Sequence, residues 1–292
     1  MEAITAGNQE AVEAWNGVLF DRFREYRHLL LPGLGAHGDK AMAVYPPPVG
    51  GRVLDIGCGF GDTTQQLAKL VGAEGSAVGI DAAVRFIDDA RAEAEEAGAE
   101  NVEFFVQDVE QGVERGPYDY AFSRMGMMFF ANPVAAMRNV ASAMTPGGRL
   151  CAVVWRRKIE NPVMYRAEQV VEGFVGHPDH DDSDEPTCGP GPFSMADADT
   201  VSMQLQAAGF EDVSFLRSDI PMLQGRDLDE AVSLVMALGP AGEVIRLAGD
   251  DAKRLEAEIG AAIREMLSDY VADDGRVWVP TSCWIVTAAL AG

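Results

Sequence analysis

Three glycines alternate with other residues between a predicted buried strand and the start of a helical pattern. They are Gly57, Gly59 and Gly61, and they directly follow the predicted strand at 53–56. Glycine reaches positive φ angles and lets a ligand approach the backbone closely. The helix that follows offers free N–H groups and positive potential at its N-terminus. The spacing therefore predicts a loop that holds part of a ligand against its backbone.

Three carboxylates stand near the ends of successive predicted strands beside this loop. Asp55 precedes the first glycine by two residues, Asp81 follows Gly57 by 24 residues, and Asp108 follows the third predicted strand. A carboxylate at the end of the second strand is placed to accept both hydroxyls of a ribose. Ligands of open α/β sheets bind in the crevice at the carboxyl ends of the strands, so we expect the three side chains to converge there.

A nicotinamide dinucleotide site is the nearest alternative, because it also has an acid after its second strand. Dinucleotide binders use G-x-G-x-x-G to seat a pyrophosphate, whereas this chain has G-x-G-x-G. The acid two residues before the loop suits a ligand with an ammonium group and no phosphate. An NAD(P)-dependent oxidoreductase on a Rossmann sheet remains an alternative, and so does a non-catalytic cofactor-binding protein.

Alternating strand and helix patterns surround these residues. Strands are predicted at 53–56, 77–80, 102–107, 118–122 and 149–155, helices at 63–71, 83–97 and 133–144, and then a helix at 195–208, a strand at 213–217, helices at 228–238 and 252–270 and a strand at 283–289. This alternation is typical of βαβ units and a parallel sheet. We predict an α/β fold with a Rossmann-like, seven-stranded, mostly parallel and doubly wound sheet, N-terminal helices and a helical insertion before the last strand.

The chain divides into four predicted parts. They are an N-terminal helical cover (1–50), the cofactor-binding Rossmann-like core (51–220) with an acidic loop (177–192), a helical insertion or cap (221–276) and the final strand of the core (277–292). In the cover, apolar residues at three-and-four spacing predict one amphipathic helix from Glu10 to Leu31, which Pro32 and Gly33 should end.

Composition excludes several classes of function. The 292 residues carry 23 Lys and Arg against 46 Asp and Glu, for a formal charge of −23. A nucleic-acid-binding protein needs a basic surface, so we expect no nucleic-acid partner. No apolar run reaches the roughly 18 to 20 residues of a membrane span, and the N-terminus lacks a basic, apolar signal pattern. The four cysteines are widely spaced, which predicts no metal site and suits a reducing compartment. With neither a span nor a signal pattern, we expect no membrane association and a cytoplasmic protein.

At this point the sequence resembles the class I S-adenosylmethionine-dependent methyltransferases. The resemblance rests on VLDIGCGFG at 53–61, GID at 79–81, QDVE at 107–110, YDYAFSRMGMMFF at 118–130 and MTPGGRL at 144–150. The run from Ser123 to Leu150, followed by VVWRRKIENP, is similar to the bacterial small-molecule branch related to quinone-biosynthesis enzymes. AAGFEDVSF at 207–215 and SCWIVTAAL at 282–290 resemble the family's later elements.

The resemblance implies S-adenosyl-L-methionine as the cofactor and a set of residues that bind it. Gly57, Gly59 and Gly61 would form the loop under its amino-acid portion, Asp81 would hold the ribose, and Asp108 with Val109 would contact the adenine. The full predicted set of cofactor contacts is Asp55, Gly57, Cys58, Gly59, Asp81, Ala82, Asp108, Val109 and Ser123.

The acceptor site is predicted from polar and apolar residues after the fourth strand and in the N-terminal cover. Arg124 either contacts an acceptor oxygen or forms an ion pair within the protein, and Trp15 and Tyr26 are pocket walls or ordinary core residues. The predicted acceptor contacts are Arg124, Met125, Met128, Phe129, Trp15 and Tyr26. A lid is expected from parts of 10–31, 160–174 and 223–242, because the core supplies only one side of a water-excluding site.

Methyl transfer requires alignment of acceptor and methyl more than it requires a base. Candidate catalytic residues are nevertheless Arg124, His28 and Tyr26, and further histidines stand at 37, 177 and 180. The pair His177 and His180 lacks a third firm metal ligand. We predict in-line methyl transfer to O, N or C of a small, largely hydrophobic acceptor that is aromatic or polyketide-like, and a homodimer is left open.

Overall fold

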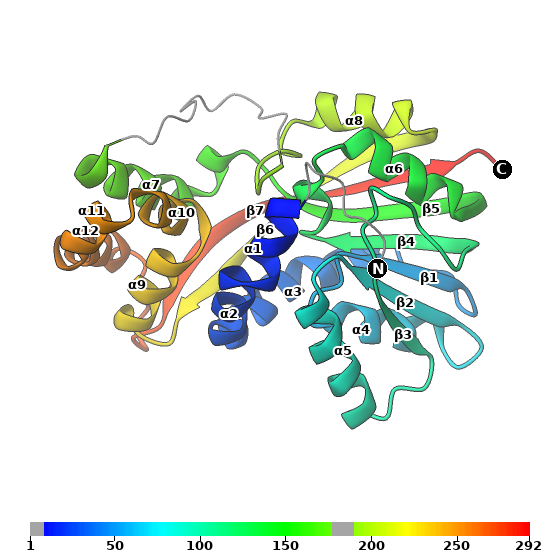
Figure 1. Ribbon diagram of the computed structural model, residues 1–292, viewed down its shortest axis with the longest axis horizontal. Coiled ribbons are helices and arrows are strands. Elements are labelled where there is room, and N and C mark those ends of the chain that lie inside the picture. The colour runs from blue at the N-terminus through cyan, green and yellow to red at the C-terminus, as the bar shows by residue number, and fades with distance from the viewer. Residues whose placement is uncertain (1–8, 177–189) are drawn as a thin grey trace.

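The computed structural model of the protein describes residues 9–176 and 190–292, and a seven-stranded mixed sheet runs through its core (Figure 1). The strand order is β3-β2-β1-β4-β5-β7-β6. Strands β1 to β5 are parallel, and β7 runs antiparallel to both of its neighbours. The strands are β1 (Arg52–Ile56), β2 (Ser76–Asp81), β3 (Val102–Val106), β4 (Tyr118–Arg124), β5 (Met144–Trp155), β6 (Phe210–Gly225) and β7 (Val277–Leu290). The predicted α/β, Rossmann-like fold is confirmed.

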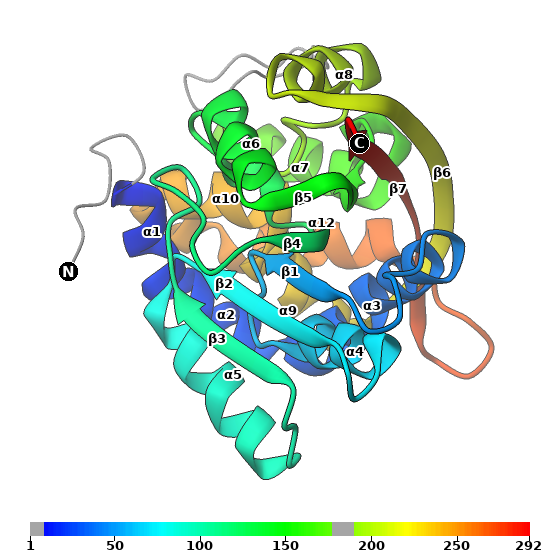
Figure 2. The same cartoon turned by 90° about the vertical axis from the view of Figure 1, so that its right-hand side faces the viewer.

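Helices cover both faces of the sheet, so its central strands are buried. The helices are α1 (Gln9–Asn16), α2 (Val18–Glu25), α3 (Arg27–Val44), α4 (Asp62–Val71), α5 (Val84–Glu96), α6 (Pro133–Ser142), α7 (Pro162–Val175), α8 (Ala198–Ala207), α9 (Leu228–Ala237), α10 (Gly239–Ala248), α11 (Asp250–Arg254) and α12 (Glu256–Ser268), with short 3-10 turns at Met127–Phe129 and Lys158–Glu160. Figure 2 shows α3, α4 and α5 on one face of the sheet and α6 and α8 on the other. Burial on both faces leaves β1 and β4 buried along nearly their whole length.

The N-terminal cover differs from its prediction. The residues expected to form one helix over 10–31 form α1, α2 and the start of α3, and α3 continues through Pro32 to Val44. Tertiary packing explains the continuation: a Cβ on Gly33 would stand 2.1 Å from Cγ of Met222 in β6. The glycine thus permits close contact between α3 and the sheet, and this burial outweighs the cost of proline within the helix.

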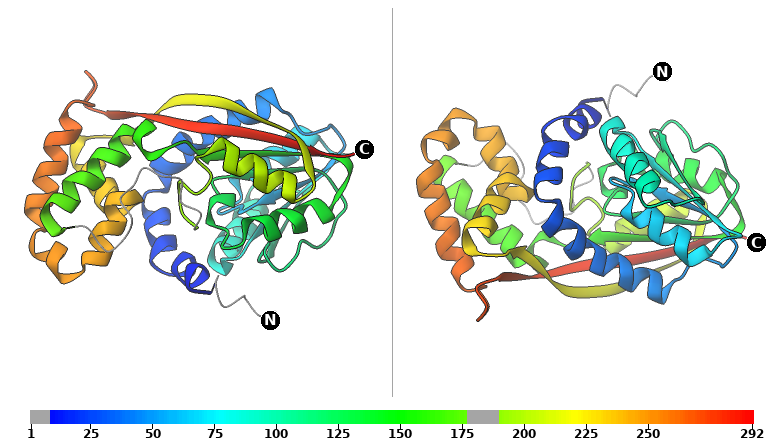
Figure 3. Two further views of the ribbon diagram at one scale, coloured as in Figure 1. Left: turned by 90° about the horizontal axis from the view of Figure 1, so that it is seen from above. Right: turned by 90° about the horizontal axis from the view of Figure 1, so that it is seen from below.

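Strands β6 and β7 are much longer than predicted and connect the core to a helical cap. Their ladder runs from Phe210 opposite Leu290 to Gly225 opposite Val277, so β6 passes residue 220, where the core was expected to end. Figure 3 shows β7, in red, extending from the core to the group formed by α7 and α9 to α12. Among the described residues no single helix is long and apolar enough to cross a membrane, and α9 with α10 meet that criterion only as a pair bent by 60°.

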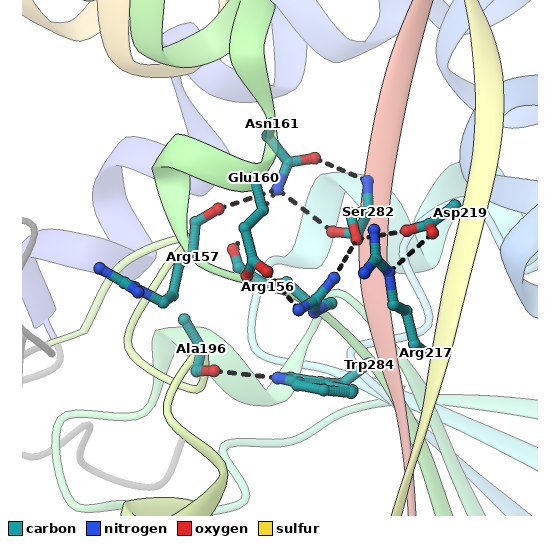
Figure 4. Close-up of polar contacts among 9 residues, drawn as sticks. All are labelled: Arg156, Arg157, Glu160, Asn161, Ala196, Arg217, Asp219, Ser282 and Trp284. Atoms are coloured by element: carbon teal, nitrogen blue, oxygen red, sulfur yellow. Dashed lines mark hydrogen bonds and ion pairs between the residues drawn. The ribbon is translucent and has the colours of Figure 1, made fainter.

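A buried polar network fixes the joint between the core and the cap (Figure 4). Arg156, just after β5, donates to Oγ of Ser282 over 2.9 Å, and Ser282 donates to Asp219 over 2.6 Å. The Asn161 amide accepts from the backbone N–H of Ser282 over 2.8 Å at the start of α7. The guanidinium of Arg156 also lies 4.4 Å from the ring centroid of Trp284. These contacts join the start of α7 to the β6–β7 ladder.

Candidate functional site

A cavity of 1190 Å³ lies between the carboxyl ends of the central strands, the helices α1 to α3 and the cap. Its wall includes residues of all three parts, among them Asp81 from the core, Trp15 from α1 and Leu234 from α9. Figure 3 shows α1 to α3 crossing between the core and the cap. Sites for one small ligand usually measure about 300–1,000 Å³. This cavity therefore has room for two small molecules side by side.

The glycine loop after β1 has the backbone that its sequence predicts. Gly57, Gly59 and Gly61 have φ angles of 67°, 52° and 77°. A Cβ on Gly57 would stand 2.9 Å from Cα of Gly126, and one on Gly61 would stand 2.7 Å from the ring of Phe104. Side chains at these positions would clash as well as strain the backbone, so glycine is required for both reasons.

Asp81 is held in place by the backbone of the neighbouring loops. Its carboxylate accepts the N–H of Gly59 over 3.1 Å and the N–H of Ala83 over 2.9 Å, and its residue forms part of the cavity wall. Burial raises the pKa of Asp81, while these backbone donors oppose that rise. The carboxylate is therefore fixed before any ligand arrives.

Further predicted cofactor residues share this part of the wall. Asp108 accepts the N–H of Glu110 over 3.0 Å and lines the cavity. Burial and the nearby carboxylates raise the pKa of Cys58 well above its usual value, so it stays a thiol. We call this part of the wall the strand-end pole, and it consists of Gly57, Cys58, Gly59, Asp81, Ala82, Asp108 and Val109.

Two predicted cofactor contacts lie behind the glycine loop and do not form the cavity wall. Asp55 is 1% exposed and accepts the hydroxyl of Thr64 over 2.6 Å, and burial raises its pKa to about 7. Ser123, equally buried, donates to the carbonyl of Ile56 over 2.9 Å. Both side chains face the interior, where they bond to neighbouring elements, so the structure does not bring them to a ligand.

Arg124 lines the cavity but is paired with Asp62 at the start of α4. One guanidinium nitrogen lies 2.8 Å and 3.1 Å from the two carboxylate oxygens of Asp62, and only 10% of the arginine side chain is exposed. Of the two roles predicted for Arg124, contact with an acceptor oxygen or an ion pair within the protein, the structure shows the ion pair. Asp62 also lines the cavity and was not predicted, although its place directly after the third glycine was a usable signal.

The apolar residues after β4 line the cavity together with the cover. Met125 has φ of 62°, which is uncommon for a side-chain-bearing residue and is typical of functional turns. Met125, Met128 and Phe129 all form part of the wall. The Trp15 ring of α1 lies edge-on to Phe129 at 5.1 Å, so the cover and the β4 turn meet at the wall.

Tyr26 and His28, the other candidate catalytic residues, do not form the wall. Tyr26 is 9% exposed and packs with Leu29 and Leu234, and burial raises its pKa. His28 points to Glu230 of α9 over 2.9 Å, at the outside of the cover. In the described part of the chain no histidine or tyrosine forms the wall of this cavity. The structure therefore does not bring these two predicted contacts to an acceptor.

Of the three remaining histidines, the structure describes only His37. His37 is fully buried, and its Nδ1 and Nε2 lie 2.9 Å from the hydroxyls of Ser218 and Thr281. Burial lowers its pKa to about 4, so it is neutral. His177 and His180, with most of the acidic loop, lie outside the described residues. Within 9–176 and 190–292, no group of three His, Cys, Asp or Glu side chains has the arrangement of a metal site.

The opposite side of the cavity is built by the cap and the far end of β6. We call part of it the cap pole, which consists of Met164, Met222, Gln224, Leu234, Val235 and Leu238. Five of these six residues are apolar. The residues come from α7, β6, α9 and the residue that follows α9, and parts of the predicted lid ranges 160–174 and 223–242 thus contribute to the wall. The cap also contributes Glu168, Glu172, Glu243 and Arg246 to the cavity wall beside this pole.

Comparison with known proteins identifies the core. A family model described as a methyltransferase domain matches residues 49–182. Aklanonic acid methyltransferase DauC of Streptomyces sp. strain C5 is 35% identical over 114 residues, which cover 39% of this chain and 52% of that protein. A ubiquinone biosynthesis O-methyltransferase of Xanthomonas axonopodis pv. citri is 36% identical over 105 residues, covering 35% of this chain and 42% of that protein. The chain thus spans about half or less of the length of these curated relatives.

Solved structures share the fold. The YcgJ protein of Bacillus subtilis superposes with a TM-score of 0.56 at 16% identity, over 88% of this chain and 99% of that one. A protein of Bacillus halodurans described as a putative methyltransferase gives a TM-score of 0.54 at 17% identity, over 87% and 98% of the two chains. At such identities the likeness concerns the fold alone.

Proposed function

The chain belongs to the class I S-adenosylmethionine-dependent methyltransferase superfamily, and we propose that it methylates a small, largely hydrophobic metabolite. The single observation that carries this proposal is one continuous cavity with two unlike ends. The strand-end pole presents fixed carboxylates and open backbone, and the cap pole is almost entirely apolar. An aromatic or polyketide-like acceptor suits the cap pole, because a flat apolar molecule gains most from burial against such a wall.

The cofactor of this superfamily is S-adenosylmethionine, which supplies an electrophilic methyl group when bound. The residues of the strand-end pole fit it on two grounds. A Cβ on Gly59 would have only the Phe86 ring within 4 Å, at 3.9 Å, so the loop opens onto the cavity there and a ligand can approach its backbone. Asp81 and Asp108 line the same end of the cavity, and their negative charge suits a cationic ligand. In this proposal Asp81 accepts the ribose hydroxyls and Asp108 lies beside the adenine.

The chain's own contribution to the reaction is alignment and exclusion of water. Trp15 and Phe129 meet across the mouth, and Arg27 of α3 pairs with Glu93 of α5, which fastens the cover to the core. With no histidine or tyrosine in the described wall, no such side chain is placed to remove a proton from the acceptor. The proposed transfer to O, N or C therefore depends on holding the nucleophile in line with the methyl group.

The membership of a finer branch is also a proposal. The relatives named above act, by their names, on aklanonic acid and in ubiquinone biosynthesis, and both names denote methyltransferases. We propose that this chain belongs with the bacterial small-molecule branch. The nicotinamide alternative has no support from these relatives or from the glycine spacing.

The test is direct measurement of cofactor binding. Calorimetry with S-adenosylmethionine and S-adenosylhomocysteine should give one site per chain, and mass spectrometry of the purified protein should detect either compound if it is retained. NADH titrated in the same way should not bind. Saturable NADH binding without S-adenosylmethionine binding would overturn the proposal in favour of an oxidoreductase.

A further inference from the structure

One polar residue in the cap pole has no partner within the protein. Gln224 is 8% exposed and lines the cavity, and its side chain makes no hydrogen bond to any residue in the described ranges. A carboxamide that faces a cavity, largely removed from bulk water and without a protein partner, is costly because its hydrogen bonds to water are not replaced by the protein. Such groups in folded proteins are therefore normally satisfied by protein, water or a ligand.

The backbone at Gln224 carries a second, independent signal. Leu223 pairs with Trp278 and Gly225 pairs with Val277, so two steps along β6 match one step along β7 and Gln224 is the extra residue of a β-bulge. Bulges redirect a side chain and are common next to active sites. Gly225 supports the same local geometry, because a Cβ there would stand 2.5 Å from the backbone nitrogen of Ala231 in α9.

The other polar side chains that line the cavity nearby are occupied. Thr281 donates to the carbonyl of Ile220 over 2.6 Å and lies 2.9 Å from Nε2 of His37. Lys158 pairs with Glu168. The Asn161 side chain accepts the backbone N–H of Ser282 and donates to the backbone carbonyls of residues 156, 157 and 282. Gln224 is thus the polar group of this pole that is open to a ligand.

We propose that the Gln224 carboxamide selects the acceptor by hydrogen-bonding a neutral carbonyl or hydroxyl group at the acceptor's cap-side end. The carboxamide both donates and accepts, so it matches a ketone or a hydroxyl, and burial against an apolar wall disfavours an ionised group. The group it binds lies away from the methyl-accepting atom, because Gln224 lies at the cap end of β6 and Asp81 lies at the carboxyl end of β2 (Figure 1). This inference rests on the proposed function and adds a specificity-determining residue to it.

The test uses three probes that differ at one carbon: 9-fluorenone, 9-fluorenol and fluorene. Binding is followed by quenching of tryptophan fluorescence, since Trp15 and Trp155 both line the cavity. The protein is measured with and without saturating S-adenosylhomocysteine. We expect the wild type to bind fluorenone about fivefold more tightly than fluorene, in proportion to one neutral hydrogen bond.

Two substitutions and one control variant test whether Gln224 causes this preference for fluorenone over fluorene. Gln224→Met keeps the side-chain shape and should bring the fluorenone-to-fluorene ratio to about one. Gln224→Glu, which only accepts when ionised, should lose fluorenone and keep fluorenol. Gln206→Met, the same exchange at an exposed position of α8 outside the cavity wall, should leave the wild-type ratio unchanged.

Each other outcome counts against the inference. A wild-type ratio of one, a ratio that Gln224→Met does not change, or a wild type that binds none of the three probes would overturn it. S-adenosylhomocysteine binding is measured by calorimetry on every variant. Failure of the proposed function would appear there as lost cofactor binding in the wild type, whereas failure of this inference alone would leave that binding intact.

Discussion

The two ends of the cavity are built by opposite physical means. At the strand-end pole, each functional group is held by nearby backbone: Asp81 by two N–H groups and Asp108 by one. At the cap pole the wall is apolar, and Gln224 has no such support. A site whose hydrogen bonds are already formed binds one defined ligand, whereas an apolar wall with one open amide accepts any molecule of suitable shape that satisfies that amide. Substitutions at the cap pole can therefore change which acceptor is bound, while the strand-end pole continues to bind the same cofactor.

The largest expected effect concerns the strand-end pole. Asp81→Ala should weaken S-adenosylmethionine binding by about 2–4 kcal/mol, because hydrogen bonds to a charged group are lost. Calorimetry measures this, and fluorenone binding by the same variant should be unchanged. Asp88→Ala, on the exposed side of α5, is the matched control and should bind the cofactor like the wild type. Equal affinities for both variants would show that the ribose does not lie on Asp81.

The next effect concerns the support of the cap pole. His37 joins α3 to β6 and β7, and burial lowers its pKa to about 4 from an unfolded value near 6.5. The unfolded chain therefore binds a proton that the folded chain rejects, and stability falls as the pH drops from 6.5 towards 4. Between pH 7 and pH 5, urea titrations should show about 2 kcal/mol more loss of unfolding free energy in the wild type than in His37→Gln.

This difference must be taken between variants, because Asp55 works in the opposite direction. Burial raises its pKa to about 7, so its contribution to stability becomes less favourable as the pH rises from about 4 to 7. Asp55 is present in both proteins and cancels in the comparison. His28→Gln, on the outside of the cover, should keep the wild-type pH dependence. A His37→Gln protein with that same dependence would contradict the assignment.

A smaller effect is expected where the cover meets the core. Trp15→Leu removes edge-on contacts with Phe23 and Phe129, at 5.2 Å and 5.1 Å, which is worth about 1 kcal/mol. Stopped-flow release of S-adenosylhomocysteine should accelerate about fivefold. Phe215→Leu breaks a similar pair with Trp284 away from the cavity and should leave the release rate unchanged. A truncation at residue 30 is a poor alternative, because it would cut α3 after its fourth residue.

Removal of metal ions is expected to have no effect on cofactor binding. The described residues contain no three-ligand cluster for a metal ion, and methyl transfer needs no Lewis acid. Dialysis against a chelator should therefore leave S-adenosylmethionine affinity within about twofold, while a mock-dialysed sample serves as the control. Loss of binding that one divalent ion restores would show that the strand-end pole contains a metal.

The sequence predicted the backbone geometry where the determinants are local, and the ligand roles of these residues stay predictions. The glycine loop, Asp81 and Asp108 each follow directly from a strand end, and a few neighbouring residues decide their geometry. Asp55 and Ser123 were expected at the ligand because of their position along the chain, but their side chains bond to Thr64 and to the Ile56 carbonyl. Position at a strand end does not state which way a side chain points.

Contacts between distant segments explain the other differences. α3 continues past Pro32 because Gly33 lies against Met222, a residue 189 positions later, and no local pattern contains that information. The length of β6 and β7 has the same cause, since each strand is extended by its pairing with the other. Arg124 was left open between two roles, and the choice depended on Asp62, which stands in another element.

The position of β7 in the sheet has a consequence for how the chain is made. β6 pairs only with β7 in the described sheet, and the residues of α9 to α12 are synthesised between them. On the ribosome, the 16 residues of β6 therefore emerge long before their partner exists. An unpaired strand of that length is a site for pairing with another chain. β7 completes the edge of the sheet and the base of the cap in one event, so nascent chains are most exposed to aggregation until this last strand is released.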